Sequence, residues 1–215
     1  MTIRVLYNYI LHMLGVREML PGDILRSKPI HECNEPMVAI APGGGIFFKG
    51  EQLFCRRSVA EKLRNVAAGL SGLGLGLYIH ELYRSPEQQK ARHQATYRRY
   101  CNEFSDKEEL EKHVRRSTAG VGGGHQTGGA VDLSLCDAEG SPIDMGSKYP
   151  DKCPQMATSY RLPTEITERR RLLCKAMRKE GFANYPAEWW HFAYGDQLWA
   201  TYRHKRHAIY GPLIK

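Results

Sequence analysis

The chain has 215 residues, of which 42% are hydrophobic and 25% are charged. This length is sufficient for one well-packed domain and short for two, and the composition is typical of a soluble globular protein. No stretch approaches the roughly 20 consecutive apolar residues of a membrane-spanning helix. The first apolar run lacks the small-residue cleavage site of a signal peptide. We therefore expect a single domain without a membrane span, located in the cytoplasm.

The charged residues and the cysteines argue against two further classes of protein. The net charge of +8 could suit a polyanion, but the basic residues are scattered among acidic, aromatic and aliphatic ones, so nucleic-acid binding is not expected. The six cysteines contain no C-x-x-C pair, which argues against a cysteine zinc finger. A chain of this length does not need disulfides, and we expect free thiols in a reducing compartment. The sequence indicates no oligomeric state.

The first part of the chain predicts short strands, then a helix and a buried strand. Residues 1–57 contain loop signals and only short apolar runs, which indicate short strands or an irregular segment. A helix follows, because Ser58 and Glu61 have the spacing of a capping box and apolar residues then recur at helical spacing up to Leu70. The aliphatic and aromatic run 75–83 is too short for a helix, so it predicts a buried strand.

Three more helices are predicted from their N-terminal signals. Ser85, followed by proline in the first turn and then by glutamine, begins one of them. Ser105 has the spacing of a capping box for a short helix near 106–116. Thr164 is the predicted cap of a helix that ends before Gly181.

Two strands complete the predicted elements, one at 130–135 and one at 188–194. The helices and strands do not alternate as regular βαβ units, and we found no internal repeat. The order of elements therefore indicates the α+β fold class.

The glycine-rich stretch 120–135, GVGGGHQTGGAVDLSL, places His125 seven residues before Asp132. A phosphate-binding loop is excluded, because the G-x-x-x-x-G-K-[ST] pattern and its lysine are missing. For His125 taken alone, a solvent-exposed histidine on a flexible loop is an open alternative. Glycines here would let the backbone come close to a metal or a substrate.

A second cluster of polar and aromatic residues changes this interpretation. Glu188 precedes His191 by three residues, with two tryptophans between them. Taken alone, this segment could be aromatic core around a hydrogen-bonded histidine. Together the two segments supply His, Asp and His as ligands and one unligated glutamate. That is the inventory of a catalytic zinc site, which has three protein ligands, an open position for water and a base.

These segments resemble one family of metallopeptidases. HQTGGAVD matches the motif H-x-x-G-x-A-x-D, EWWH matches E-x-W-H, and Tyr83-Arg84-Ser85 follows a predicted strand like the family's Y-R-x segment. The three together are similar to the zinc D-Ala-D-Ala metallopeptidases, which include the D-alanyl-D-alanine dipeptidases of vancomycin resistance and the peptidoglycan D,D-carboxypeptidases. The resemblance covers roughly residues 58–194. It implies a single α+β domain that carries zinc on a central antiparallel sheet and is flanked by helices.

The resemblance also implies a role for each matching residue. His125, Asp132 and His191 would hold one Zn²⁺ per chain, Glu188 would be the general base, and Arg84 would stabilise the reacting carbonyl. Zinc can lower the pKa of its water to about 7, so a nearby carboxylate can take the proton at neutral pH. A guanidinium beside the zinc would meet the negative charge that attack on an amide creates.

The expected activity is hydrolysis of the D-Ala-D-Ala dipeptide by metal-activated water, because several segments resemble the dipeptidase branch. The first alternative is a D,D-carboxypeptidase acting on peptidoglycan stem peptides, which would need export by a route not visible in the sequence. The second is a non-catalytic zinc-binding module that binds a partner. A purely structural site would need neither Glu188 nor Arg84, which argues against the module.

The substrate is expected to be a short peptide ending in D-alanine. The resemblance makes Tyr83, Gly123 and Asp151 candidate substrate contacts. Gly123 is a departure, because the dipeptidases usually carry serine two residues before the first histidine. A family acid that would meet the free amine of the substrate falls near Pro150, one place before Asp151. Residues 58–194 would form the catalytic core, and residues 1–57 could cover the cleft.

Overall fold

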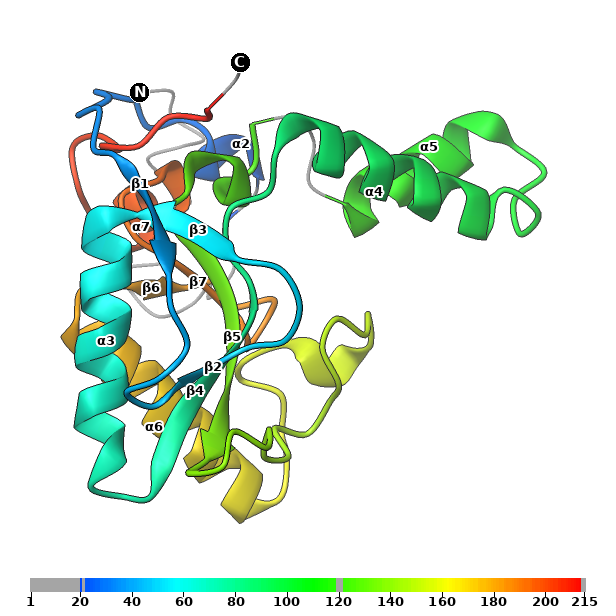
Figure 1. The fold of residues 1–215 in the computed structure, drawn as a ribbon. Helices are drawn as coiled ribbons and strands as arrows, with labels where there is room; N and C mark the ends of the chain where they lie inside the picture. Colours follow the sequence, from blue (N-terminus) through cyan, green and yellow to red (C-terminus); the bar gives the residue numbers. More distant parts are fainter. Residues whose placement is uncertain (1–19, 21, 119–121, 214–215) are drawn as a thin grey trace.

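The computed structural model describes residues 20, 22–118 and 122–213 of the chain (Figure 1). Its centre is a sheet with the strand order β2-β4-β5-β7-β6. The strands are β2 (Ile46–Phe47), β4 (Leu75–Glu81), β5 (Ala130–Asp137), β7 (His191–Ala193) and β6 (Ala183–Asn184). All neighbours are antiparallel except β2 and β4, which are parallel. The predicted α+β class and central antiparallel sheet are confirmed.

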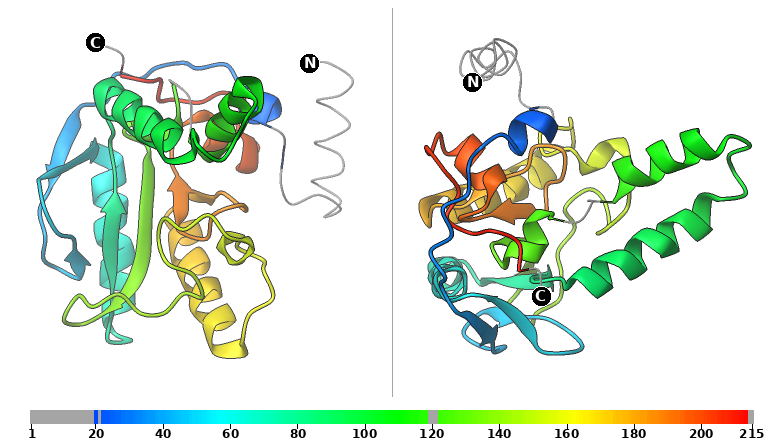
Figure 2. Two further views of the ribbon diagram at one scale, coloured as in Figure 1. Left: turned by 90° about the vertical axis from the view of Figure 1, so that its right-hand side faces the viewer. Right: turned by 90° about the horizontal axis from the view of Figure 1, so that it is seen from above.

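Strand alternation separates a packed face of the sheet from a polar face. Helices α3 (Arg57–Ser71) and α6 (Thr164–Lys179) pack on the sheet (Figures 1 and 2). Val131, Leu133 and Leu135 of β5 belong to the same buried core as residues of both helices. Because successive side chains of a strand point to opposite faces, Asp132 and Ser134 point away from this core layer. The polar face of the sheet is where the candidate site lies.

The N-terminal region contributes short elements, as its sequence predicted. Strands β1 (Met37–Ile40) and β3 (Leu53–Arg56) form a separate antiparallel pair. The four-residue helix α2 (Gly22–Leu25) packs near α7 (Gln197–Tyr202) at the other end of the chain. The predictions for residues 1–19 and 21 lie outside the described residues.

Helices α4 (Pro86–Tyr100) and α5 (Lys107–Ser117) run antiparallel and project from the body as an arm (Figures 1 and 2). The predicted cap of α4 is confirmed, since Gln88 N donates to Ser85 Oγ over 3.2 Å and Ser85 N donates to Gln88 Oε1 over 2.9 Å. Among the described side chains of α4, Gln89 is the fully buried one. The arm is therefore anchored at its base, beside the sheet.

Three of the predicted helix caps are wrong. Helix α3 begins at Arg57, one residue before the predicted cap, and Ser58 N and Oγ both donate to Glu35 Oε1 over 2.6 Å. This carboxylate caps the helix from a distant part of the chain and complements the helix dipole. Helix α5 is capped by Asp106 rather than Ser105, and Thr164 is already the first residue of α6.

The six cysteines are free thiols, as expected. Burial raises the pKa of the Cys55 thiol to about 12 and that of Cys174 to about 11, so both stay protonated at neutral pH. Within residues 20, 22–118 and 122–213, no helix combines the length and the apolar character that a membrane span requires.

Candidate active site

Asp132 and His191 are brought together by strand pairing. They are direct partners across β5 and β7, and His191 Nδ1 lies 2.8 Å from Asp132 Oδ1. Burial opposes the charged form of Asp132, but hydrogen bonds and charges of His125 and His191 hold its pKa well below the ordinary value. Asp132 is therefore an ionised carboxylate inside the protein, on the polar face of the sheet.

His125 joins this pair from the short 3₁₀ helix η1 (Gly124–Thr127), which leads into β5. His125 Nδ1 donates to the carbonyl oxygen of Leu82 over 2.7 Å, and His125 Nε2 lies 3.3 Å from Asp132 Oδ1. Because Nδ1 is used by this carbonyl, Nε2 is the ring nitrogen that faces Asp132 and that could bind a metal. Gly128 ends η1 with φ of +71°, a left-handed conformation that favours glycine.

The donor set of His125, Asp132 and His191 fits a zinc ion. Their ligand atoms all lie within 4.8 Å of one another. Ligands about 2.0–2.1 Å from a tetrahedral zinc ion lie roughly 3.3 Å apart. The measured distances to Asp132 Oδ1, 3.3 Å from His125 and 2.8 Å from His191, are close to this spacing. Two imidazoles and one carboxylate would leave a fourth position open, as in catalytic zinc sites.

The carboxylates of Asp132 and Glu188 favour a positive charge at the metal-ligand cluster, as the pKa of His191 shows. Burial lowers the pKa of His191, but the hydrogen bond and charge of Asp132 and the charge of Glu188 outweigh it, so the net pKa is raised. The raised pKa shows that the buried negative charge favours a positive charge at this position. A metal cation would supply this charge while the ligating imidazole stays neutral.

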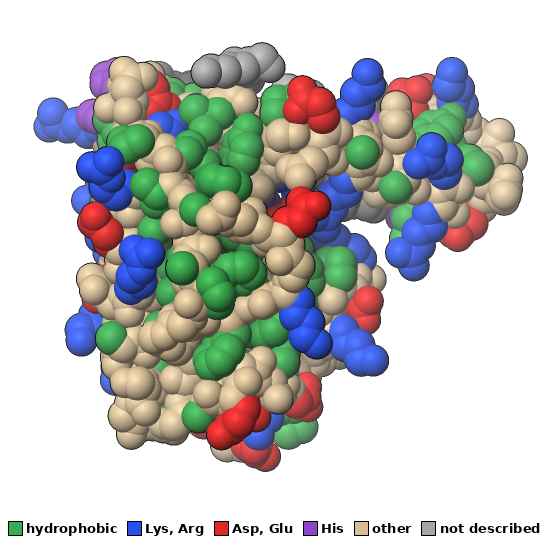
Figure 3. All heavy atoms as spheres, in the orientation of Figure 1, with side chains coloured by type: hydrophobic (Ala, Val, Ile, Leu, Met, Phe, Trp, Pro, Cys, Tyr) green, Lys and Arg blue, Asp and Glu red, His purple; other side chains and the backbone are tan. Residues whose placement is uncertain are grey.

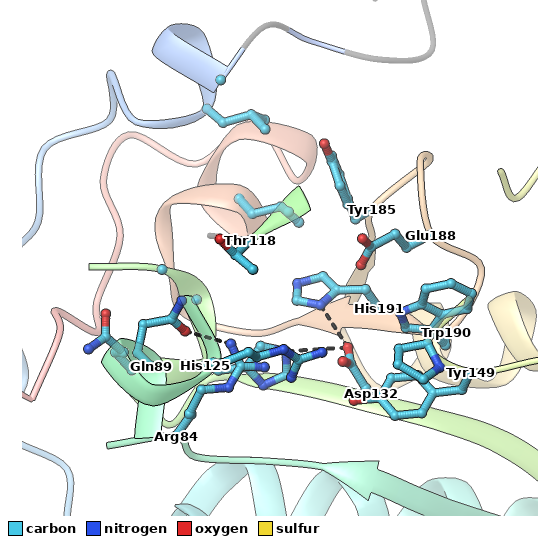
Figure 4. Close-up of a pocket in the computed structure, with 18 of the residues that line it drawn as sticks. Arg84, Gln89, Thr118, His125, Asp132, Tyr149, Tyr185, Glu188, Trp190 and His191 are labelled. Atoms are coloured by element: carbon cyan, nitrogen blue, oxygen red, sulfur yellow. Dashed lines mark hydrogen bonds and ion pairs between the residues drawn. The ribbon is translucent and has the colours of Figure 1, made fainter. Parts of the chain in front are cut away.

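Glu188 lies next to this cluster on a tight turn. The predicted strand 188–194 is only partly correct, because β7 begins at His191. Glu188 N donates to Tyr185 O over 2.9 Å, and His191 N donates to Glu188 O over 3.1 Å. These turn bonds place the Glu188 side chain near His191 (Figure 4). The carboxylate also forms an ion pair with Lys152 Nζ, which the sequence did not predict.

Arg84 approaches the cluster from the end of β4. The strand has a register irregularity between Ile79 and Glu81, after which Glu81 lies opposite Asp132. Arg84 is 7% exposed, and its Nε donates to Glu81 Oε1 over 2.6 Å. Nη1 of Arg84 donates to Gln89 Oε1 over 2.6 Å, and Nη2 donates to Glu81 Oε2. These bonds hold the guanidinium beside His125 and Asp132 (Figure 4).

Glu81 is the centre of a network of positive groups. Its Oε2 also accepts from Arg92 Nη1 over 2.8 Å and from Tyr149 Oη over 3.1 Å. Burial would raise the pKa of Glu81, but the hydrogen bonds from Arg84 and the charges of His125, Arg84 and Arg92 lower it to about 2. Glu81 is therefore ionised at neutral pH and holds two arginines at the site.

These residues line a cavity of about 300 Å³ at the junction of the arm and the body. Figure 3 shows the molecule hollowed at this junction, with basic and acidic side chains around the hollow. A second cavity of about 400 Å³ adjoins it and shares Gly123, Gly124 and His191. The described lining of the first cavity includes these polar residues: Arg26, Arg84, Gln89, Arg92, Thr118, His125, Gln126, Asp132, Tyr149, Lys152, Tyr185, Glu188 and His191.

Of the three predicted substrate contacts, Gly123, Tyr83 and Asp151, one lies at the candidate site and two lie elsewhere. Gly123 lines both cavities. Tyr83 lies elsewhere, on a groove with Phe54 and Pro86, because it alternates with Arg84 along an extended segment. Asp151 is exposed and is absent from the residues that line the cavity. Only Gly123 of the three is therefore close to the metal-ligand cluster.

The described part of the N-terminal segment reaches the site. Gly22, Leu25 and Arg26, in and just after α2, line the same cavity as His125 and His191. Arg26 is exposed on the outer side of this cavity. These three residues therefore lie at the cavity, and the covering of the cleft by residues 1–57 stays a prediction.

Sequence reasoning missed several residues of the site, of which Glu81 and Lys152 matter most. Glu81 had a usable signal, since an acid at the end of a buried strand requires a cationic partner and Arg84 follows three residues later. Lys152 had none, because it lies on an irregular loop whose path depends on tertiary contacts. The amide Nε2 of Gln126 is buried without a hydrogen-bond partner among the described residues.

The chain is similar to two curated relatives named D-alanyl-D-alanine dipeptidase. One, from Synechocystis sp., is 37% identical over 95 residues, which are 39% of this chain and 38% of the relative. The other, from Escherichia coli, is 36% identical over 74 residues, which are 34% of this chain and 38% of the relative. The matched segments therefore span well under half the length of either relative.

Two solved structures share the fold. One, a vancomycin resistance D,D-pentapeptidase VanY mutant in complex with Zn(II), has a TM-score of 0.54 at 15% identity and covers 86% of this chain and 92% of its own. The other, VanYB in complex with D-alanine-D-alanine, has a TM-score of 0.52 at 16% identity and covers 85% of this chain and 91% of its own.

The family comparison covers most of the chain, including the metal-ligand cluster, Glu188 and Arg84, but not the residues of α2 that line the cavity. Residues 46–209 match the peptidase family described as D-ala-D-ala dipeptidase. This range contains β4 with Arg84, the His125–Asp132 segment and the Glu188–His191 turn. The chain therefore belongs to the D-ala-D-ala dipeptidase family of peptidases.

Proposed function

We propose that this chain is a zinc-dependent peptidase that hydrolyses the peptide bond between two D-alanine residues. The observation that carries the proposal is the convergence of His125, Asp132 and His191 ligand atoms within 4.8 Å, in the cavity that Glu188 also lines. A single zinc ion per chain would be held by these three residues. Family membership supports the substrate class.

Glu188 is the candidate general base. When bound, zinc supplies a Lewis acid that activates water and polarises the peptide carbonyl. The Glu188 carboxylate lies beside the cluster, so it can accept the proton of the attacking water and pass it to the leaving amine. Lys152 Nζ and the Tyr185 turn hold this carboxylate in place.

Arg84 is the candidate electrostatic stabiliser. A guanidinium has five N–H groups, and three of those of Arg84 are used by Glu81 and Gln89. The others remain for the carbonyl oxygen, on which negative charge develops during attack. Glu81 and Gln89 keep the guanidinium from rotating, so little reorganisation is needed when this charge appears.

The alternative of a non-catalytic zinc module is disfavoured by the same geometry. A structural site closes all four zinc positions with protein ligands. Here the described residues supply a three-residue cluster, with a carboxylate and a buried guanidinium beside it. Such groups suit a reacting carbonyl rather than a closed metal site.

The test is release of D-alanine by the purified, zinc-loaded chain. D-Ala-D-Ala and N-acetyl-D-Ala-D-Ala are the substrates, L-Ala-L-Ala controls for stereochemistry, and Glu188→Gln controls for contaminating peptidases. We expect D-alanine from at least one D,D-peptide, and none after zinc is removed with a chelator. No release from either peptide by a chain that contains one equivalent of zinc would refute the proposed function.

A further inference from the structure

Positively charged side chains outnumber negatively charged ones among the described residues that line the candidate site. The described residues that line the cavity of about 300 Å³ include four permanent cations, Arg26, Arg84, Arg92 and Lys152, and two carboxylates, Asp132 and Glu188. Zinc would add two further positive charges. A substrate entering this cavity therefore meets mainly positive potential.

Neither carboxylate of the cavity is available to a substrate. Asp132 Oδ1 contacts both histidines of the metal-ligand cluster, over 3.3 and 2.8 Å. Glu188 is paired with Lys152 Nζ and is the proposed base. Glu81, just behind the lining, is already saturated by two arginines and the Tyr149 hydroxyl. Among the described residues that line this cavity, an ammonium group would find no unpaired carboxylate.

A carboxylate, in contrast, would find several donors. Arg26 is exposed at the cavity, and the Arg92 side chain is 36% exposed. The buried Gln126 Nε2 lacks a hydrogen-bond partner among the described residues. The cavity thus provides for the C-terminal carboxylate of a peptide but not for a free amino terminus.

Lys152 is the lining cation that forms an ion pair with the proposed base, Glu188. In a dipeptide, the free amine is two bonds from the carbonyl carbon that water attacks. Glu188 must reach that water, and Lys152 Nζ forms an ion pair with Glu188. We therefore place the amine of a bound dipeptide within reach of the Lys152 charge. The Lys152 side chain also lies over the Trp190 ring, 5.7 Å from its centroid, which keeps it at the cavity wall.

We propose that Lys152 is a specificity-determining residue that repels a free amino terminus, so that the preferred substrate is an N-acylated peptide ending in D-Ala-D-Ala rather than the free dipeptide. This inference rests on the proposed function. A unit charge several ångströms away in a partly buried site changes binding by roughly tenfold. Acylation removes the charge of the substrate amine and with it this repulsion.

The experiment measures one ratio, kcat/KM for N-acetyl-D-Ala-D-Ala divided by kcat/KM for D-Ala-D-Ala. Effects of a variant on Glu188 or on zinc act on both substrates and cancel in this ratio. We expect at least about tenfold preference for the acylated peptide in the unaltered chain. Lys152→Met, which keeps the length of the side chain, should lower the ratio about tenfold, and Lys152→Glu should lower it further.

Two controls separate charge from structure. Lys148→Glu makes the same charge change on the same loop, outside the lining of this cavity, and should leave the ratio unchanged. Raising the pH above about 8 deprotonates the amine of the free dipeptide and should bring the ratio of the unaltered chain closer to one. A ratio near one at neutral pH, or a ratio unaffected by both Lys152 variants, would overturn the assignment.

Failure of the proposed function can be told apart from failure of this inference. If the zinc-loaded chain cleaves neither peptide, the function fails, and both peptides can be titrated as ligands by calorimetry. In that case, roughly tenfold tighter binding of the acylated peptide, lost in Lys152→Glu, would still support the role of Lys152. Equal binding, or no binding of either peptide, would refute it.

Discussion

Glu81 holds Arg84 through both carboxylate oxygens, with Nε donating to Oε1 over 2.6 Å and Nη2 donating to Oε2. The two residues are three apart, at the point where the register of β4 shifts beside Asp132. Bidentate pairs of this kind fix the plane of a guanidinium as well as its position. The pair therefore connects the edge of the sheet to the candidate catalytic chemistry, and both partners can be tested separately.

Arg84→Ala should lower kcat/KM by a factor on the order of 10² to 10³, the usual effect of removing one donor to a developing oxyanion. Zinc content should stay unchanged, because Arg84 is not a ligand. Arg84→Lys keeps the charge but loses the bidentate geometry, so it should recover little activity. Steady-state kinetics on an N-acylated D-Ala-D-Ala peptide measure this. Near-normal activity of Arg84→Ala would show that another group stabilises the carbonyl oxygen.

Glu81 should make the stability of the protein depend on acidic pH. Its pKa is lowered from 4.5 to about 2, so its ionised form stabilises the folded state. A shift of this size corresponds to roughly 3 kcal/mol, which is present above pH 4.5 and is lost as the pH falls toward 2. Glu81→Gln should be less stable at neutral pH and lose less stability over this acidic range. Urea unfolding at several pH values measures both effects.

The exposed Glu61 on α3 provides the matched control for this measurement. Glu61→Gln makes the same change in an open position, so its unfolding free energy should follow that of the unaltered chain at each pH. Parallel pH profiles for the unaltered chain and Glu81→Gln would contradict the proposed stabilising role of Glu81.

Glu188→Gln should keep the fold and the zinc and lose turnover by at least about 10²-fold, the low end for a positioned general base. The amide has nearly the same shape, but it cannot accept the proton of the attacking water. Turnover of the acylated peptide, with zinc content and circular dichroism measured on the same sample, tests this. Activity within a few-fold of the unaltered chain on every cleaved substrate would exclude Glu188 as the base.

The sequence predicted most of the helices and central strands, because these depend on local patterns, and the three residues that it suggested as metal ligands come together in the structure. Asp132 and His191 are direct partners across β5 and β7, and His125 joins them from η1, just before β5, so that ligand atoms of the three lie within 4.8 Å of one another. Apolar periodicity was enough to find α3, α6 and the central strands. The predicted cap of α3 was wrong because the actual cap comes from a residue far away in the chain. The Glu35 carboxylate takes this role in place of Ser58.

Which side chains face the cavity around the metal-ligand cluster could not be predicted either, because this too depends on contacts between distant parts of the chain. Whether Tyr83 or Arg84 faces the cavity depends on where alternation begins after the irregularity in β4. Whether Asp151 or Lys152 faces it depends on how the loop after β5 folds over Trp190. Local sequence rules do not contain this information.

One equivalent of zinc per chain should be bound and should depend on both histidines of the cluster. His125→Ala and His191→Ala each remove one of three ligands, so metal content after dialysis should fall sharply. His93→Ala is the control, since His93 lies in the middle of α4 and its Nδ1 is hydrogen-bonded with Thr118 Oγ1 rather than with the cluster. Metal analysis by mass spectrometry measures all three variants. Unchanged zinc in both cluster variants would refute the site.

Gly123→Ser should raise kcat/KM for the free dipeptide by roughly tenfold. Gly123 lines both cavities, and its φ of −65° and ψ of 163° are accessible to serine without strain. A new hydroxyl that reaches the substrate would add one hydrogen bond, worth about 0.5 to 1.5 kcal/mol, or 1.5 to 3 kcal/mol to a charged group. A dipeptide offers few contacts, so one added bond is a large share of its binding.

Gly123→Ala separates the hydroxyl from the added carbon, because only serine supplies a donor at this position. We expect Gly123→Ser to exceed Gly123→Ala by about the same factor of ten on D-Ala-D-Ala, and by less on the acylated peptide, which has other contacts. The repulsion from Lys152 is independent of this change, so Gly123→Ser and Lys152→Met together should add in free energy. Equal kinetics for the serine and alanine variants on the free dipeptide would show that position 123 does not contact the substrate.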